Sequence, residues 1–369
     1  MLKKTHIAVA QNASGRNLHV PVYTLGCGKP GPKVYIQSSI HGAEVQGNVV
    51  IHHIIQHLAD REIFGSITLV PSCNPVGTNI KAGEYTLGRF DPVNGTNWNR
   101  GYFFDESAVL QFADEVKETD DIIKIKQDFQ RHWQALIQDK INTDWGIPLA
   151  QRLNLTLQLV ALDADIVMDL HNGPVSSRHI YVPEYAECEI GHFSVSHNIL
   201  IPNRFAGALD EATFCPWWTL SQCLEAKFSR CYAFEKYAYT IEMGSQEVID
   251  FAEGDTDAQN ILAYLGEKEV LFDCEFTALN MTRYVTDLAD YKTLYSDFGG
   301  MVEYVAKPGQ LTKRGETMAR MLNIDELDNA NAVKEIAAPC DLIPILHFPS
   351  ASVLSGTQLY KCFTNFRVF

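Results

Sequence analysis

The stretch from residue 34 to residue 71 constrains the fold most, because it contains a strand, a helix and a second strand in direct succession. Residues 34–37 are β-branched and aromatic, residues 49–58 have the length and apolar periodicity of a helix, and residues 67–70 are again short and apolar. This order is typical of a parallel crossover unit. We therefore predict an α/β fold whose sheet begins near this stretch.

The remaining chain adds helices and further strands, and its character changes towards the C-terminus. Residues 105–160 are charged and helical, whereas residues beyond about 275 form short apolar runs separated by turns, as in the segment 299–316. Other elements are expected as strands at 166–170 and 238–243 and as a helix at 257–266. We predict a catalytic α/β domain over 1–280, with a helical insertion at about 105–160, and an all-β domain over 281–369.

Composition and charge exclude several classes of protein. The 369 residues carry a formal net charge of −15, and both nucleic acids and anionic membranes attract clustered Lys and Arg instead. The apolar run at 7–10 is too short for a signal peptide, and no segment reaches membrane-spanning length. The nine cysteines are an odd number without a C-x-x-C pair, which suits reduced thiols. We expect a cytoplasmic protein that binds neither nucleic acid nor membrane.

The turn between the first predicted strand and its helix carries His41-Gly42-Ala43-Glu44. Side chains three residues apart at a helix start can point the same way, so an imidazole nitrogen and a carboxylate oxygen could bind one cation. The pattern H-x-x-E is short and occurs often by chance. The alternative interpretation is a solvated helix N-terminus at which the helix dipole stabilises the glutamate.

A third metal ligand is predicted at His171, which directly follows the strand that contains Asp169. If this strand runs parallel to the strand that ends near Ile40, His171 emerges at the same sheet edge as His41 and Glu44. Two histidines and one glutamate leave an open position for water, as in catalytic zinc sites. Asp169 could orient a ligand histidine. A histidine bonded only to backbone at a strand end is the alternative.

Glu242 ends another predicted strand, between Ile241 and Met243. Partial desolvation there favours a raised pKa and suits a general base that acts on metal-bound water. An ion pair with a lysine is the alternative.

Arg89 and Arg100 lie in a long Gly- and Asn-rich loop, and their guanidinium groups could bind a substrate carboxylate or stabilise an oxyanion. The alternatives there are solvated loop charges or a structural arginine that binds a backbone carbonyl.

His53 and His57 are four residues apart on the first predicted helix. The intervening residues are Ile54, Ile55 and Gln56, so the H-E-x-x-H string of metalloproteases is absent. We interpret both histidines as helix-face residues.

In chain order, these motifs resemble the succinylglutamate desuccinylase/aspartoacylase family, a branch of the zinc carboxypeptidase superfamily. The resemblance covers about residues 34–250, and the segment 299–315 is similar to the C-terminal β-domain of the family. The matching motifs are His41-Gly42-Ala43-Glu44, Asn74-Pro75, Asn99-Arg100, Asp169-Leu170-His171 and Ile241-Glu242-Met243-Gly244. The implied fold is a zinc-carboxypeptidase-like mixed sheet flanked by helices, with a small C-terminal all-β domain.

The resemblance also implies residue roles. The expected ligands of one Zn²⁺ per chain are His41, Glu44 and His171, and Glu242 is the expected catalytic acid/base. Asn99 and Arg100 would hold the substrate carboxylate, and Arg89 would polarise the scissile carbonyl. The chain departs from the family at Asn97, where many members have Asp, in the spacing from Arg89 to Asn99-Arg100, and in the insertion at 105–160.

We therefore expect a zinc-dependent amidohydrolase that acts on linear amides and removes the acyl group from an N-acylated amino acid or a related small molecule. One alternative is a metallocarboxypeptidase that acts on a peptide or a cell-wall peptide. An alternative of another class is a non-catalytic zinc- or ligand-binding protein, against which the presence of Glu242 beside three ligands argues. The expected partner is the small-molecule N-acyl substrate, and a homo-oligomer is left open.

Overall fold

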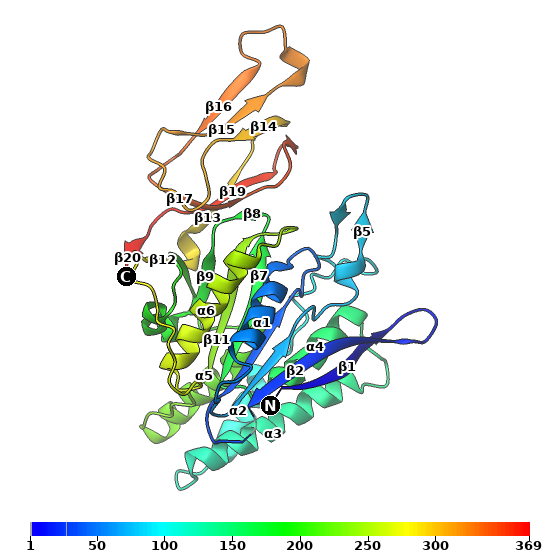
Figure 1. Cartoon of the computed structure of the whole chain (residues 1–369), viewed down its shortest axis with the longest axis vertical. Coiled ribbons are helices and arrows are strands. Elements are labelled where there is room, and N and C mark those ends of the chain that lie inside the picture. The colour runs from blue at the N-terminus through cyan, green and yellow to red at the C-terminus, as the bar shows by residue number, and fades with distance from the viewer. Residues whose placement is uncertain (1, 27) are drawn as a thin grey trace. The chain divides into compact units, whose positions relative to one another are not determined.

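The computed structural model describes residues 2–26 and 28–369 and divides into two compact units (Figure 1). The first unit comprises Met1–His171, Asn203–Thr240 and Ile249–Thr277. The second unit comprises Asn172–Pro202, Ile241–Val248 and Ala278–Phe369. Each unit therefore contains segments that are far apart in the sequence.

A mixed sheet forms the centre of the first unit, with its strands in the order β1-β2-β4-β3-β7. These strands are β1 (Lys3–Gln11), β2 (Asn17–Gly26), β3 (Lys33–Ser38), β4 (Ser66–Val70) and β7 (Ile166–Gly173), the last two residues of which belong to the second unit. β3 pairs in parallel with both β4 and β7, and its last residue, Ser38, lies opposite Leu170. Chain segments that follow β3 and β7 therefore emerge at the same sheet edge.

Two groups of helices accompany this sheet. α1 (Gln46–His57) and α6 (Phe251–Glu267) lie side by side, and the Gln46 side chain joins them through two hydrogen bonds with the backbone of Asp250 (Figure 1). The other group shares a separate apolar core around Phe129, Trp133 and Trp217. This group contains α2 (Glu106–Glu115), α3 (Ile122–Ile141), α4 (Leu149–Ala161) and α5 (Leu209–Phe228).

The second unit is mostly β-structure. β9 (His179–Pro183), β10 (His197–Ile201) and β12 (Tyr284–Asp287) pair in parallel, and β20 (Arg367–Val368) pairs antiparallel with β12. Two four-stranded antiparallel sheets follow, in the orders β13-β19-β17-β8 and β16-β15-β14-β18. Their strands are β8 (Val175–Ser176), β13 (Tyr291–Tyr295), β14 (Gly300–Tyr304), β15 (Thr317–Leu322), β16 (Val333–Ala337), β17 (Ile343–His347), β18 (Ser352–Val353) and β19 (Gln358–Phe363).

The remaining elements are short or shared. β11 (Tyr237–Ser245) begins in the first unit and ends in the second. The hairpin β5 (Lys81–Ala82) and β6 (Tyr85–Thr86) lies in the long loop of the first unit. Short 3₁₀ turns are η1 (Gly77–Asn79), η2 (Glu184–His192), η3 (Leu288–Asp290) and η4 (Ile324–Glu326).

The predicted fold class is confirmed: the chain has a large mixed sheet with helices and additional small all-β sheets. The domain boundary at 280/281 stays a prediction. The segment 105–160 contains α2, α3 and most of α4, as the charge and periodicity indicate. Within the described residues, no helix combines the length and the apolar character that crossing a membrane requires.

Candidate metal centre

The turn after β3 is fixed by a network of short hydrogen bonds. Ser39 adopts a left-handed backbone conformation with φ of 62°, which is uncommon for a residue with a side chain. Its Oγ donates to the backbone oxygen of Glu44 at 2.8 Å and accepts from Asn48 Nδ2 at 2.9 Å. The Asn48 Oδ1 atom accepts from Ser38 Oγ at 2.6 Å and from the Ser72 amide at 2.8 Å. His41 and Glu44 thus lie on a rigid turn before α1, not within its first helical turn.

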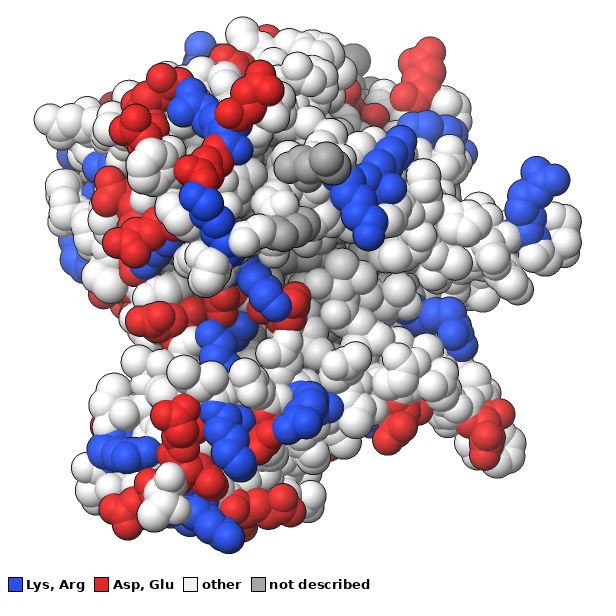
Figure 2. Space-filling model, turned by 60° about the horizontal axis from the view of Figure 1, so that its bottom comes forward, with Lys and Arg blue, Asp and Glu red and all other residues white. Residues whose placement is uncertain are grey.

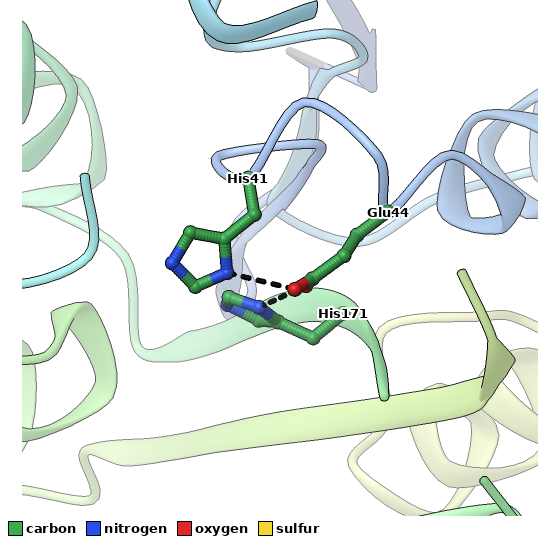
Figure 3. A group of neighbouring side chains, drawn as sticks. All are labelled: His41, Glu44 and His171. Atoms are coloured by element: carbon green, nitrogen blue, oxygen red, sulfur yellow. Dashed lines mark hydrogen bonds and ion pairs between the residues drawn. The ribbon is translucent and has the colours of Figure 1, made fainter. Parts of the chain in front are cut away.

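His41, Glu44 and His171 converge at this turn (Figure 3). Glu44 Oε1 lies 2.9 Å from His41 Nδ1, and Glu44 Oε2 lies 2.7 Å from His171 Nδ1. All three residues are buried, and one potential ligand atom from each lies within 4.8 Å of the others. Two imidazole nitrogens and a carboxylate oxygen match the donor set of a catalytic zinc site. The residues present therefore fit the ion that the motif predicts.

The outer nitrogen of each histidine also has a partner. His41 Nε2 donates to Asn97 Oδ1 at 2.8 Å, and His171 Nε2 lies 2.9 Å from Asp169 Oδ2. Gln37 Nε2 in turn donates to Asp169 Oδ1 at 2.9 Å. Partners of this kind orient ligand histidines, and here Nδ1 of each ring faces Glu44.

The electrostatics of Glu44 and His171 favour their charged forms. Burial by itself would raise the pKa of Glu44, but the adjacent His41 and His171 hold the pKa of this carboxyl well below its ordinary value. Burial opposes a charge on His171, yet Asp169 and Glu44 raise the pKa of its imidazole well above the ordinary value.

The long loop between η1 and Asn99 packs directly onto the turn that carries His41 and Glu44. The Gly42 amide donates to the Gly88 oxygen at 2.8 Å. This contact brings Arg89 to the site, where its Nη1 lies 3.0 Å from Glu44 Oε1 while half of the side chain remains exposed. Further along, Asn99 is buried with its Nδ2 3.3 Å from His171 Nε2. Arg100 is exposed and donates through Nη1 to the Asn99 oxygen at 2.6 Å.

Comparison with known protein families assigns the chain to one of them. The family model of the succinylglutamate desuccinylase/aspartoacylase catalytic domain matches residues 30–267. The chain belongs to this family. Its members are hydrolytic deacylases, so the convergence of His41, Glu44 and His171 lies in the catalytic domain of an enzyme family.

Solved structures of similar proteins agree in fold. A protein from Shewanella frigidimarina NCIMB 400, described as a succinylglutamate desuccinylase/aspartoacylase, is 40% identical with a TM-score of 0.96, over 100% of this chain and 98% of that chain. A family protein from Shewanella amazonensis SB2B is 40% identical with a TM-score of 0.94, over 100% of both chains. The ectoine utilization protein EutE (DoeB) from Ruegeria pomeroyi is 12% identical with a TM-score of 0.68, over 99% of this chain and 95% of that chain, and shares the fold. Comparison with curated proteins gave no match.

Glu242 lies on the part of β11 that belongs to the second unit, where it is half-buried. The charge of Glu242 affects Tyr291. Burial, followed by Tyr181 and Glu242, raises the pKa of the Tyr291 hydroxyl well above its ordinary value. The predicted acid/base role of Glu242 stays a prediction. The same holds for the substrate-binding roles of Asn99 and Arg100 and for the role of Arg89.

Two polar residues complete the site beyond the predicted set. Asn97 was expected only as a departure from the family pattern, and it is the partner of His41. Gln37 belongs to a strand that is predicted as apolar, but its side-chain amide is buried and polar contacts surround it. Its Nε2 donates to Asp169, and its Oε1 accepts from the Tyr35 hydroxyl at 2.9 Å. A glutamine at the end of an otherwise apolar strand was the signal that could have revealed it.

Proposed function

We propose that this protein is a zinc-dependent hydrolase that cleaves the amide bond of an N-acylated amino acid or a related small molecule. The observation that carries the proposal is the buried convergence of His41, Glu44 and His171, with the Nδ1 atoms of both rings directed at the carboxylate. Membership of a deacylase family supports the reaction class. One Zn²⁺ per chain would be held by these three residues.

The chemistry divides between the ion and the chain. When bound, zinc supplies a Lewis acid and lowers the pKa of a coordinated water from about 15.7 to about 7. Glu242 is assigned the proton transfers, first from the attacking water and then to the leaving amine. Arg89, which contacts Glu44, is assigned the stabilisation of negative charge on the carbonyl oxygen. Asn99 and Arg100 are assigned to the substrate carboxylate.

Glu242→Gln tests the proton carrier. The amide cannot accept the proton from water, so we expect kcat to fall by about 10²–10⁴-fold. Zinc content should stay at the wild-type level, because Glu242 is not among the three proposed ligands. Glu225→Gln, on an exposed position of α5, is the matched control and should keep wild-type activity. Near-normal turnover of Glu242→Gln on a confirmed substrate would show that the assignment is wrong.

The substrate class separates the deacylase from the carboxypeptidase alternative. A screen of N-acetyl, N-succinyl and N-formyl amino acids together with short peptides should show hydrolysis of the acylated amino acids. Preferential removal of C-terminal residues from peptides would favour the metallocarboxypeptidase instead. Stoichiometric zinc without hydrolysis of either group would favour the non-catalytic binding protein.

The charge distribution supports a small-molecule partner. The net charge is −15, and the face seen in Figure 2 shows Lys and Arg interspersed with Asp and Glu. A nucleic acid requires a concentrated positive surface, and an anionic membrane attracts one. We therefore retain the proposal of a small N-acyl substrate, with no nucleic acid and no membrane as partner.

A further inference from the structure

A second group of metal-ligand residues lies where α1 meets α6, apart from the candidate metal centre. His53 and His57 are one turn apart on α1, and both face Asp255 on α6. His57 Nε2 lies 2.6 Å and His53 Nδ1 lies 3.5 Å from the same oxygen, Asp255 Oδ1. The side chains are 20%, 26% and 37% exposed for His53, His57 and Asp255, so ions in solution can reach them.

The hydrogen bonding of this group is incomplete. Among the described residues, His53 Nε2 is buried without a partner, and the contact from Nδ1 to Asp255 is at the limit of a hydrogen bond. Asp255 Oδ2 accepts from Gln259 Nε2 at 2.9 Å, which orients the carboxylate and leaves Oδ1 directed at both imidazoles. The cluster therefore has one well-held carboxylate and one histidine that lacks a good partner.

We propose that His53, His57 and Asp255 form a second binding site for a divalent transition metal such as zinc. Residues four apart on a helix are neighbours on one face, and two imidazoles with a carboxylate are ligands that zinc accepts. Nδ1 of His53 and Nε2 of His57 each approach Asp255 Oδ1, but among the described residues the three ligand atoms do not yet lie within 4.8 Å of one another as those of His41, Glu44 and His171 do. A cation would therefore have to draw the two imidazoles together around the carboxylate. The cation would attract the carboxylate and both ring nitrogens at once.

The proposed site lies between α1 and α6, so a bound metal would connect these two helices. The Gln46 side chain already joins α1 to the start of α6 through Asp250. His57 lies eleven residues further along α1, about 16 Å at the rise of an α-helix. The contact of His57 with Asp255 joins the same two helices at a second point, and a metal held by His53, His57 and Asp255 would strengthen this connection. Binding to the folded state alone would raise the thermal stability of the first unit.

Zinc binding to the full-length, metal-stripped protein tests the proposal. Titration with ZnCl₂ against a chromophoric chelator should reveal two equivalents, a tight one and a weaker one. The double variant H53Q/H57Q should lose only the weaker equivalent and keep its amide hydrolysis. His171→Ala should lose the tight equivalent and still gain thermal stability from added zinc, and this gain should disappear in H171A/H57Q.

His52→Gln is the control for a neighbouring histidine, since His52 is exposed on the same helix and packs edge-on against the His53 ring, with centroids 5.2 Å apart, but forms no ion pair with Asp255 among the described residues. It should keep both equivalents. A second equivalent that survives unchanged in H53Q/H57Q, or one that is absent from the wild type, would overturn the proposal. If His171→Ala does not fold, the comparison of wild type with H53Q/H57Q decides the question alone.

Discussion

Three glycines let the backbone segments of the candidate metal centre approach each other. A Cβ atom on Gly42 would lie 2.1 Å from the oxygen of Gly77, and a Cβ on Gly88 would lie 2.1 Å from the same oxygen. Gly42 and Gly88 do not have positive φ, so space and not backbone conformation requires glycine here. This close approach allows the hydrogen bond from Gly42 to Gly88 and places Arg89 beside Glu44.

At the residue scale, the buried carboxyl of Asp210 should make the stability of the fold depend on pH. Burial, followed by the charge of Glu211, raises the pKa of Asp210 to about 7, and its carboxyl lies beside the Thr240 hydroxyl at 2.9 Å. The folded state therefore holds a proton that the unfolded state releases above about pH 4. Stability should fall as the pH rises from about 4 to about 7 and then level off.

The measurement is the thermal midpoint of the wild type and of Asp210→Asn between pH 5 and pH 8 at constant ionic strength. Asparagine carries no titrating proton, so the decline assigned to this group should be missing from the variant. An equal decline in both proteins would assign the pH dependence to other groups.

The predicted ligand residues could be found from the sequence because His41 and Glu44 come shortly after one recognisable apolar strand and His171 lies at the end of another, although β7 extends past His171 to Gly173 instead of ending before it. Parallel pairing of β3 with β7 then brings His41 and Glu44 to His171. The partners of the histidines were harder to assign. Asn97 comes from a loop without periodicity, and its contact with His41 depends on how that loop folds back. The pairing of Gln37 with Asp169 depends on strand register, which single-sequence patterns do not define.

At the scale of elements, α5 has no counterpart among the sequence predictions, and it contains a proline that is unusual inside a helix. It contains Pro216, which lacks an amide hydrogen and leaves the oxygen of Ala212 without its helical donor. Gln158 Nε2 from α4 approaches this oxygen at 3.4 Å and replaces the missing bond. The compensation comes from a residue 54 positions away in the sequence, so local propensity could not indicate it.

The helical insertion should be a separate contributor to stability. Trp133 on α3 is buried and packs against Phe129 and Phe103, with ring centroids 5.5 Å and 5.1 Å away. Trp133→Ala removes this contact and leaves a cavity, so we expect the free energy of unfolding to fall by about 3–5 kcal/mol in urea denaturation.

Trp145→Ala is the matched control, because Trp145 lies in the same insertion and is 97% exposed. It should change the free energy of unfolding by no more than about 0.5 kcal/mol. Zinc affinity should remain unchanged in both variants, since neither tryptophan contacts the candidate metal centre. A loss of zinc binding in Trp133→Ala that still folds would instead show that the insertion helps to hold the candidate metal centre in place.

At the scale of the whole molecule, the chain passes repeatedly between its two compact units. The second unit takes its residues from Asn172–Pro202, Ile241–Val248 and Ala278–Phe369. The change from helices to short strands near residue 275 indicates where the last of these segments begins. The two earlier segments are short and have no shift of composition, so only tertiary contacts could assign them to the same unit.

The central claim is that a metal held by His41, Glu44 and His171 is required for amide hydrolysis. The most direct measurement is the rate of hydrolysis of the best N-acyl amino acid from the screen, with metal-stripped protein titrated with zinc. We predict negligible activity without metal, a linear rise to a plateau at the first equivalent, and no recovery in His171→Ala. Full activity of metal-free protein, or zinc-restored activity in His171→Ala, would contradict the account.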